Sequence, residues 1–370
     1  MKLLFDAPTI RNRSDGIDFI RAFFALWVMA AHLVPWSARV VDDAERSVLE
    51  QIFRGIARLF QSSGETHPAV LGFIVLSGYC IHRNGARRDN NFAIRGYALR
   101  RIFRIWPVYV LAVIVGVVLF FVSSAQDTEM ARALLGTDGI STACVIAKLT
   151  GVSSFIPGLH ICSFQGNAPL TTAMVEIWLY VLYGVVVTLL FRGVSQTTLF
   201  TAIGAAYLAM FVVVAVLPEL RGWWHNGSVF SFALYWWIGA LFVQSELPSR
   251  RFITVVIVAW VILTALLMER TVESFVLTEM RKIVFAVMIG YCVVLFDRRQ
   301  RSWYRLGSRI GLAGYSIYAL HAPVLVALLV LGVPGWGAFL AVLAIAGLTF
   351  LSFERPLTDL GKRYARQVTA

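Results

Sequence analysis

Three charged or ionisable residues fall in the first apolar stretch of the chain. Arg21 and His32 are spaced so that, on a helix, they lie within about 20° of one face and roughly 16 Å apart along the axis. Asp18 precedes Arg21 by one turn and can orient it. A guanidinium suits a phosphate or carboxylate, and a neutral imidazole can take a proton from a hydroxyl. The spacing therefore indicates an anion-binding residue and a general base on one helix.

Two further apolar stretches contain ionisable side chains. Glu176 lies one turn from Thr172 and Tyr180, so the three share a helix face. His321 is a second histidine in an apolar segment, two residues before Pro323. Ionisable groups are costly inside a bilayer and mark functional sites there. Together these residues predict a polar site inside an otherwise apolar protein.

A cationic face precedes a third apolar stretch. Arg100, Arg101 and Arg104 recur at helical spacing. A polyphosphate ligand such as coenzyme A would bind such a face. Ordinary anchoring of a membrane helix by basic residues gives the same pattern.

Structural interpretations compete with the functional ones. His32 is also consistent with an interfacial histidine beside Trp36, and Glu176 with a buried partner for an arginine. The presence of Arg21 on the same face favours a functional role for His32.

The composition indicates what positions these residues. The 370-residue chain is 58% hydrophobic and 15% charged, with a mean hydropathy of +0.73, more apolar surface than a soluble core of this size can hide. Strand-like alternation is absent, and helices satisfy their own backbone hydrogen bonds in lipid. We therefore expect an all-α, polytopic integral membrane bundle of about ten transmembrane helices.

Ten apolar segments are candidate spans, at 17–36, 68–82, 105–125, 170–191, 197–217, 229–245, 252–268, 283–296, 311–331 and 335–353. The formal net charge is +12, but the basic residues cluster between spans, so nucleic acid is not an expected partner. Most Lys and Arg residues fall in segments that would share the side of the N-terminus, which predicts that both termini are cytoplasmic.

Two cysteines fall in the long outer segment 126–169. Cys144 and Cys162 are either disulfide-bonded or free thiols, and an oxidising compartment would favour the bond. Cys80 and Cys292 lie in predicted spans and are expected to pack as small apolar residues.

Six motifs in chain order together resemble the membrane-bound acyltransferase family 3. They are Arg21 with ten residues before His32, FIVLSGY at 73–79, RRIFRIWPVY at 100–109, Glu176 with Tyr180, YSIYALH at 315–321, and Glu354-Arg355-Pro356. The resemblance covers nearly the whole chain. It departs from the family at Thr171-Thr172-Ala173, where members commonly show Trp-Ser-Leu before the glutamate.

The resemblance implies a single transmembrane acyltransferase domain, which we expect over 1–370, in a multi-pass location such as a bacterial inner membrane. No soluble stretch is long enough for a separate domain, so the C-terminal hydrolase-like domain of some members is not expected. The resemblance implies acetyl-coenzyme A as the donor, O-acetylation of a saccharide in a surface or exported polysaccharide such as an exopolysaccharide, and essential roles for Arg21 and His32. It also implies that Arg100, Arg101 and Arg104 face the donor. Expected partners are the acyl-coenzyme A, the saccharide acceptor, membrane lipids and proteins of polysaccharide synthesis or export; no metal is expected.

We therefore expect His32 and Glu176 to be catalytic, and Arg21 with the three arginines to bind the donor. Supporting or acceptor-side roles are expected for Asp18, Ser77, Tyr180 and His321. His32 acts either as a general base or as a nucleophile that forms an acyl-histidine. The alternative function is a transporter or flippase for a polar or glycolipid solute, since intramembrane charges also line solute pathways. A membrane subunit that has lost activity is a third reading, disfavoured because Arg21, His32 and Glu176 are present.

Overall fold

The computed structural model describes residues 14–37, 48, 51–52, 60, 65–85, 93–135, 140–158, 169–191, 193–243, 249–268, 274–299 and 301–369. Every regular element in these residues is a helix, and no strand occurs among them. The predicted all-α class is confirmed.

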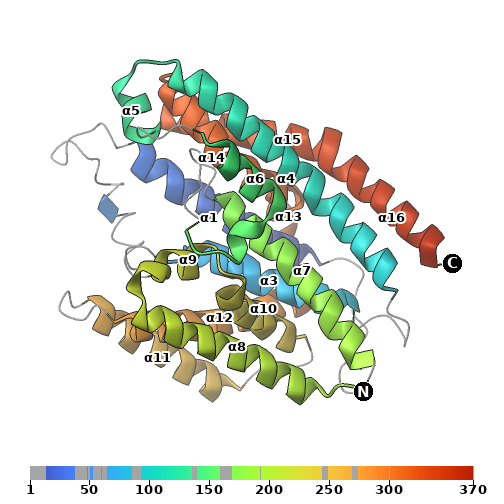
Figure 1. Ribbon diagram of the computed structural model, residues 1–370. Helices are drawn as coiled ribbons and strands as arrows, with labels where there is room; N and C mark the ends of the chain where they lie inside the picture. The colour runs from blue at the N-terminus through green and yellow to red at the C-terminus, as the bar shows by residue number, and fades with distance from the viewer. Residues whose placement is uncertain are drawn as a thin grey trace. The chain divides into compact units, whose positions relative to one another are not determined.

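A helix covers each of the ten predicted spans (Figure 1). These helices are α1 (Asp15–Ser37), α3 (Pro68–Gly85), α4 (Ile94–Ser124), α7 (Pro169–Phe191), α8 (Gln196–Val216), α10 (Val229–Leu241), α11 (Arg250–Met268), α12 (Phe275–Arg298), α14 (Gly314–Val330) and α15 (Gly335–Thr349).

Not all of these helices would cross a membrane unaided. Within the described residues, six helices are long and apolar enough to span a bilayer, or seven if α13 (Tyr304–Leu312) and α14 form one bent span. Helices α3 and α10 are apolar but shorter, and α12 carries Glu279, Arg281 and Lys282 in its first half. The chain is a multi-pass membrane protein. Three of its predicted spans, those at α3, α10 and α12, are too short or too charged to cross a bilayer without packing against neighbouring helices.

Several helices extend beyond the predicted spans. Helix α4 begins at Ile94 rather than at 105, so the cationic residues that precede the apolar stretch are helical. Helix α12 begins at Phe275 rather than at 283. Beyond the predicted end at 353, α15 continues through a π-helical turn, η6 (Phe350–Glu354), into α16 (Arg355–Thr369). Hydropathy finds the apolar part of a helix and misses turns that carry charge.

The outer segment 126–169, expected as a loop, contains short helices. They are α5 (Glu129–Leu135), α6 (Thr142–Thr150) and the 3-10 turn η3 (Val152–Ser154). Ser141 caps α6 by accepting a hydrogen bond from the Cys144 amide, and Gly151 ends it in the left-handed conformation. Cys144 is disulfide-bonded; its predicted partner, Cys162, lies outside the described residues.

The chain divides into two compact units. Unit 1 holds Met1–Phe24, Arg58–Ile94 and Trp178–Gly311, and unit 2 holds Ala25–Ala57, Arg95–Ile177 and Leu312–Ala370. Helices α1 and α7 each begin in one unit and end in the other.

Unit 1 is built around the pair α3 and α10, which pack more extensively than any other pair of helices in the part of the chain described. Gly78 of α3 faces the Trp236 carbonyl, and Gly239 of α10 faces the Val75 carbonyl, so closely that a Cβ at either glycine would overlap the opposite backbone. The two glycines allow the helix axes to approach. Most of the residues of α3 are accordingly buried.

Unit 2 is organised around α14, which is buried along almost its whole length. It lies beside α15 and also contacts α5, and Figure 1 shows α14 and α15 side by side. A helix that is apolar all round is buried, and α14 fits this rule except for the polar side chains that follow Gly314. Those side chains form the candidate site.

Candidate active site

The centre of the site in unit 2 is a pair of histidines. His32 of α1 and His321 of α14 lie with Nδ1 of the first 3.0 Å from Nε2 of the second. Their rings stack at 5.1 Å between centroids, and Trp36 stacks on His32 at 4.9 Å. His321 is fully buried and His32 is half-buried. The structure therefore joins two residues that the sequence analysis had singled out separately.

The backbone assigns the tautomers of this pair. Nδ1 of His321 lies 2.7 Å from the Tyr318 carbonyl oxygen and 3.2 Å from that of Ile317. A carbonyl only accepts, so Nδ1 of His321 carries the proton, and Nε2 of the neutral ring accepts. Nδ1–H of His32 then donates to it, which leaves the lone pair on Nε2 of His32. Since an oriented imidazole with a lone pair on one ring nitrogen is the requirement for a general base, the pair is suited to proton abstraction.

Polar side chains before His321 fix α14 to three other elements of unit 2. The Tyr315 hydroxyl donates to the Ile105 carbonyl of α4 at 3.2 Å. Ser316 donates to the Glu354 carboxylate in the π turn at 2.5 Å, and Tyr318 donates to the Pro169 carbonyl at the start of α7 at 3.0 Å. The tyrosine- and serine-rich run at 315–321 is thus explained as a set of helix contacts that hold His321 in place.

Glu176 belongs to the same neighbourhood, and its expected catalytic role stays a prediction. Its carboxylate and the Thr172 hydroxyl interact with Tyr318, which is beside His321. The ring that contacts His32 is His321, which was expected to have a supporting or acceptor-side role. The contact between the two histidines could not be predicted from the sequence because 289 positions separate them.

Arg21 and its partners lie in unit 1. Arg21 donates to Asp18 at 2.5 Å and contacts the Cys80 sulfur at 3.9 Å, so Cys80 is not merely the apolar residue expected from its segment. Tyr180 is within electrostatic range of the guanidinium. The Arg21 side chain is 17% exposed, and the Asp18 contact orients it as expected.

Ser77 and Tyr180, both expected to support the site, contact each other. The Ser77 hydroxyl donates to the Tyr180 phenol at 3.0 Å, and Trp236 Nε1 lies 3.4 Å from the same hydroxyl. These bonds tie α3 to α7 and α10 within unit 1 next to Arg21.

Arg100, Arg101 and Arg104 are half-buried on the first turns of α4 in unit 2. Arg101 packs over the Tyr97 ring at 5.8 Å. These residues are partly exposed, and guanidinium groups suit phosphate recognition. No cluster of three or more metal-ligating side chains occurs among the residues that the structure describes.

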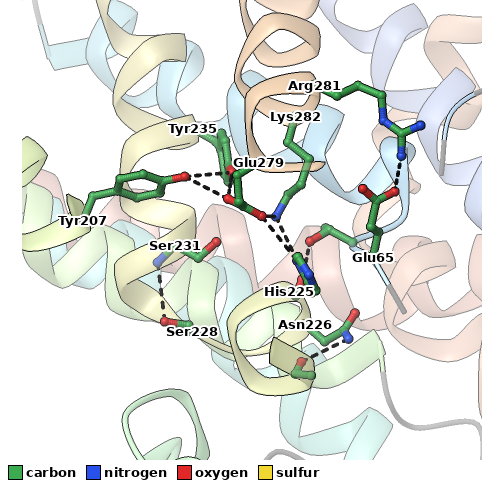
Figure 2. A network of polar contacts seen from close by, with 12 residues as sticks. Glu65, Tyr207, His225, Asn226, Ser228, Ser231, Tyr235, Glu279, Arg281 and Lys282 are labelled. Atoms are coloured by element: carbon green, nitrogen blue, oxygen red, sulfur yellow. Dashed lines mark hydrogen bonds and ion pairs between the residues drawn. The ribbon is translucent and has the colours of Figure 1, made fainter. Parts of the chain in front are cut away.

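A buried charge network lies in unit 1 and was not predicted from the sequence (Figure 2). Glu279 of α12 accepts hydrogen bonds from the phenols of Tyr207 and Tyr235, at 2.8 and 2.6 Å, and from Lys282 at 2.8 Å. His225 Nδ1 lies 3.3 Å from Lys282 Nζ. Burial, and then the Lys282 ammonium, hold the pKa of His225 below its usual range.

A second buried ion pair lies beside this network. Arg281 of α12 pairs with Glu65, and Figure 2 shows their side chains pointing toward each other. The formal charges of this cluster sum to zero, and each charged side chain is bonded to another of them or to a neighbouring side chain; its members are Glu65, Glu279, Arg281 and Lys282. We therefore interpret the cluster as a structural contact between helices rather than as a reactive site. The i to i+3 spacing of Glu279 and Lys282 was the sequence feature that could have indicated this ion pair.

A scan against protein-family models matches the Acyl_transf_3 model, an acyltransferase domain, over residues 14–353. The chain belongs to acyltransferase family 3. A search of curated proteins and a search of solved structures each found no match. As a family 3 member, the chain is a membrane acyltransferase, and the match includes Arg21, both histidines, the α4 arginines and Glu176. The family resemblance noted from the motifs is confirmed; the roles of individual residues stay predictions.

Proposed function

We propose that the chain transfers an acyl group, and specifically acetyl, from cytosolic acyl-coenzyme A to a hydroxyl of a saccharide, as in a surface or exported polysaccharide. One observation supports this most directly: His32 is held by His321 at 3.0 Å with its Nε2 lone pair available. Membership of an acyltransferase family supplies the reaction class.

In the proposed reaction, Nε2 of His32 takes the proton of the acceptor hydroxyl as its oxygen attacks the thioester carbonyl. The resulting tetrahedral intermediate collapses by breaking the C–S bond. The imidazolium of His32 returns the proton to the departing sulfur, so the products are an O-ester and a free thiol. His321 stays hydrogen-bonded to Nδ1–H of His32 throughout and stabilises the imidazolium, the part that a carboxylate plays in a catalytic triad.

Arg21 of unit 1 and the arginines of α4 in unit 2 are each proposed to contact the donor. Arg21 and His32 are on one helix, α1, at a spacing of roughly 16 Å, which is comparable to an extended pantetheine arm. Asp18 presents the Arg21 guanidinium in one orientation, as a fixed phosphate ligand requires.

The alternative reaction course passes through an acyl-histidine, with Nε2 of His32 as the nucleophile. The tautomer assignment permits both courses because each uses the same lone pair. Mass spectrometry of protein quenched during turnover distinguishes them, since only the second adds an acyl group to His32.

The test uses purified full-length protein, acetyl-coenzyme A and a saccharide acceptor, and follows thiol release together with ester formation. We expect His32→Ala to lower kcat by roughly 10²- to 10⁴-fold, the usual contribution of a general base, while thermal unfolding stays close to that of the parent. Thioester turnover that His32→Ala leaves unchanged would contradict the proposal. Acceptor translocation without ester formation would instead favour the transporter.

A matched pair of substitutions tests the donor site. Arg101→Gln and Arg104→Gln are expected to raise KM for acetyl-coenzyme A, whereas Arg250→Gln is not. Arg250 begins α11 on an exposed face and is predicted to lie on the same cytoplasmic side, so it controls for general loss of positive charge. An equal rise in KM for all three variants would exclude a specific phosphate site on α4.

A further inference from the structure

The last helix of the chain, α16, packs against the first turns of α4. A Cβ added at Gly361 of α16 would lie 2.4 Å from the Phe103 Cβ of α4, and the rings of Phe103 and Tyr364 are 5.8 Å apart. Both helices belong to unit 2, and Figure 1 shows them running in opposite directions. Because Gly361 has no side chain, the basic end of α16 can approach the cationic start of α4.

This contact determines which side chains share a flank of the helix pair. Lys362 and Arg366 lie about 100° and 140° round α16 from Gly361, at about 100° per residue. In the same rotational sense, Arg100 and Arg104 lie about 60° and 100° round α4 from its own contact residue. Since the helices are antiparallel, equal senses of rotation point to the same side of the pair. These cations of α4 and α16 therefore lie on one flank, which we call the cationic flank.

The opposite flank of the helix pair is apolar. Ile102 and Trp106 of α4 and Tyr364 of α16 are exposed, and the same count places all three on the other side of the contact. Exposed apolar side chains suit lipid, whereas clustered cations suit an anionic ligand. The pattern of exposed side chains thus agrees with the two flanks assigned from the contact.

The cations that α16 contributes are accessible to a ligand. The Lys362 side chain is 53% exposed, and its ammonium lies 2.7 Å from the exposed Asp359 carboxylate. An exposed ion pair of this kind contributes little free energy, so a more highly charged anion can compete for Lys362. Arg366 is exposed as well. Asp359 is the one acidic residue of α4 and α16 together, which leaves the cationic flank with a net positive charge.

The two sets of cations lie at different distances from the histidine site. Tyr315, in the histidine-bearing helix α14, donates to the carbonyl of Ile105, the residue directly after the α4 arginines. The next residue, Ser316, donates to Glu354. Lys362 lies roughly 12 Å past Glu354 along the continuous helix, at about 1.5 Å per residue. The α4 arginines are therefore closer to the candidate base than the α16 cations are.

We propose that Lys362 and Arg366 bind the 3′-phosphate of the coenzyme A donor, so that α16 selects coenzyme A over its 3′-dephospho form. This inference rests on the proposed function. In coenzyme A the pyrophosphate joins the pantetheine arm to the ribose, and the 3′-phosphate on the ribose is farther from the thioester. With the acyl group at His32, the α4 arginines are placed for the pyrophosphate and the more distant α16 cations for the 3′-phosphate.

Anionic lipid headgroups are the competing ligand, because they also attract basic helix ends. The continuous helix from Gly335 to Val368 has 34 residues, which makes it about 51 Å long, against about 40–45 Å for a bilayer with its headgroups. The end of α16 therefore extends past the headgroups into solution. That position favours a soluble nucleotide over a lipid.

A binding experiment tests this selection without requiring turnover. Full-length protein in neutral detergent is titrated with coenzyme A or 3′-dephospho-coenzyme A at constant ionic strength, and dissociation constants are measured by calorimetry. We expect the parent to bind coenzyme A at least about tenfold more tightly than the dephospho form, the usual contribution of charge-assisted hydrogen bonds. Lys362→Gln and Arg366→Gln should each reduce this preference, and the double variant should abolish it by weakening coenzyme A binding alone.

Arg363→Gln is the matched control. Arg363 is an exposed cation of the same helix, but at about 200° from Gly361 it faces away from α4. Its substitution removes the same charge as Lys362→Gln and should leave the preference of the parent unchanged. An equal loss of preference in Arg363→Gln, or no loss in the double variant, would overturn the proposal.

The remaining outcomes identify a different ligand or separate the site from the reaction. Stabilisation by phosphatidylglycerol micelles that depends on Lys362 and Arg366, with coenzyme A binding unchanged in the variants, would overturn the assignment to the donor. A preference for coenzyme A that depends on α16 without any acyl transfer supports the site and contradicts the proposed function. Acyl transfer with a preference independent of α16 contradicts only the site.

Discussion

At the scale of single residues, the site depends on which ring nitrogens of two histidines carry protons. Backbone carbonyls determine the proton on His321, and His321 determines the proton on His32. The sequence indicated that His32 and His321 were unusual, because each is an ionisable group in an apolar segment. It could not indicate that they touch, since that contact requires α1 and α14 to pack together.

His321 is therefore expected to act as a positioning residue. His321→Gln keeps an acceptor that can bond Nδ1–H of His32, whereas His321→Ala removes it. We expect His321→Ala to lower kcat by about tenfold or more, though less than His32→Ala, with little change in KM for acetyl-coenzyme A. His321→Gln should recover part of that kcat.

Steady-state kinetics with both substrates measure this difference. A structural defect alone would lower the active fraction in both variants alike and would not depend on the acceptor at position 321. Equal kcat in His321→Ala and His321→Gln, or an effect confined to the donor KM, would contradict the positioning role.

The burial of Lys148 could not be predicted from the sequence. It lies in the run TACVIAKLT of the outer segment, where a single lysine is expected to be solvated. Its burial arises from the packing of α6 against α4 and α7, which no local pattern reveals. The departure of Thr171-Thr172-Ala173 from the family pattern was the only indication that this region differed.

At the scale of elements, a helix lies at each of the ten apolar runs predicted as spans, but the runs did not predict the charged turns that begin or extend these helices, nor α16. Glu279, Arg281 and Lys282 are helical because they are paired and buried. Hydropathy assigns such residues to loops, since it takes no account of a partner from another helix. The close approach of α3 and α10 could not be predicted from the sequence either, because a glycine in an apolar run does not indicate which residue it packs against.

Replacement of Gly239 by alanine tests the contact between α3 and α10. Its Cβ would lie 2.0 Å from the Val75 carbonyl oxygen, so the helices must separate. We expect destabilisation of at least about 1–3 kcal/mol, the usual cost of overpacking. Gly204→Ala in α8 is the control, because nothing lies within 4 Å of its added Cβ and alanine favours a helix.

Thermal unfolding of the two variants in the same detergent gives the comparison. Gly239→Ala should lower the midpoint, and Gly204→Ala should leave it unchanged or raise it slightly. A midpoint for Gly239→Ala equal to that of the parent would show that α3 and α10 do not approach as closely as described.

At the scale of the whole molecule, α1 carries Arg21 in one compact unit and His32 in the other. The family match covers most of both units. The proposed reaction requires in addition that Arg21 be near the cytosol and His32 farther out. That orientation follows from the predicted topology, in which both termini are cytoplasmic, and so the topology itself is the property to measure.

Single cysteines report the topology directly. Glu219 lies in the turn η5 (Pro218–Leu220), on the predicted outer side, and Arg250 begins α11 on the cytoplasmic side; both are exposed. With Cys80 and Cys292 replaced by alanine, a membrane-impermeant maleimide should label Glu219→Cys in intact cells. It should label Arg250→Cys only after the membrane is permeabilised. Labelling of Arg250→Cys in intact cells would invert the helices and place His32, rather than Arg21, beside the cytosolic donor.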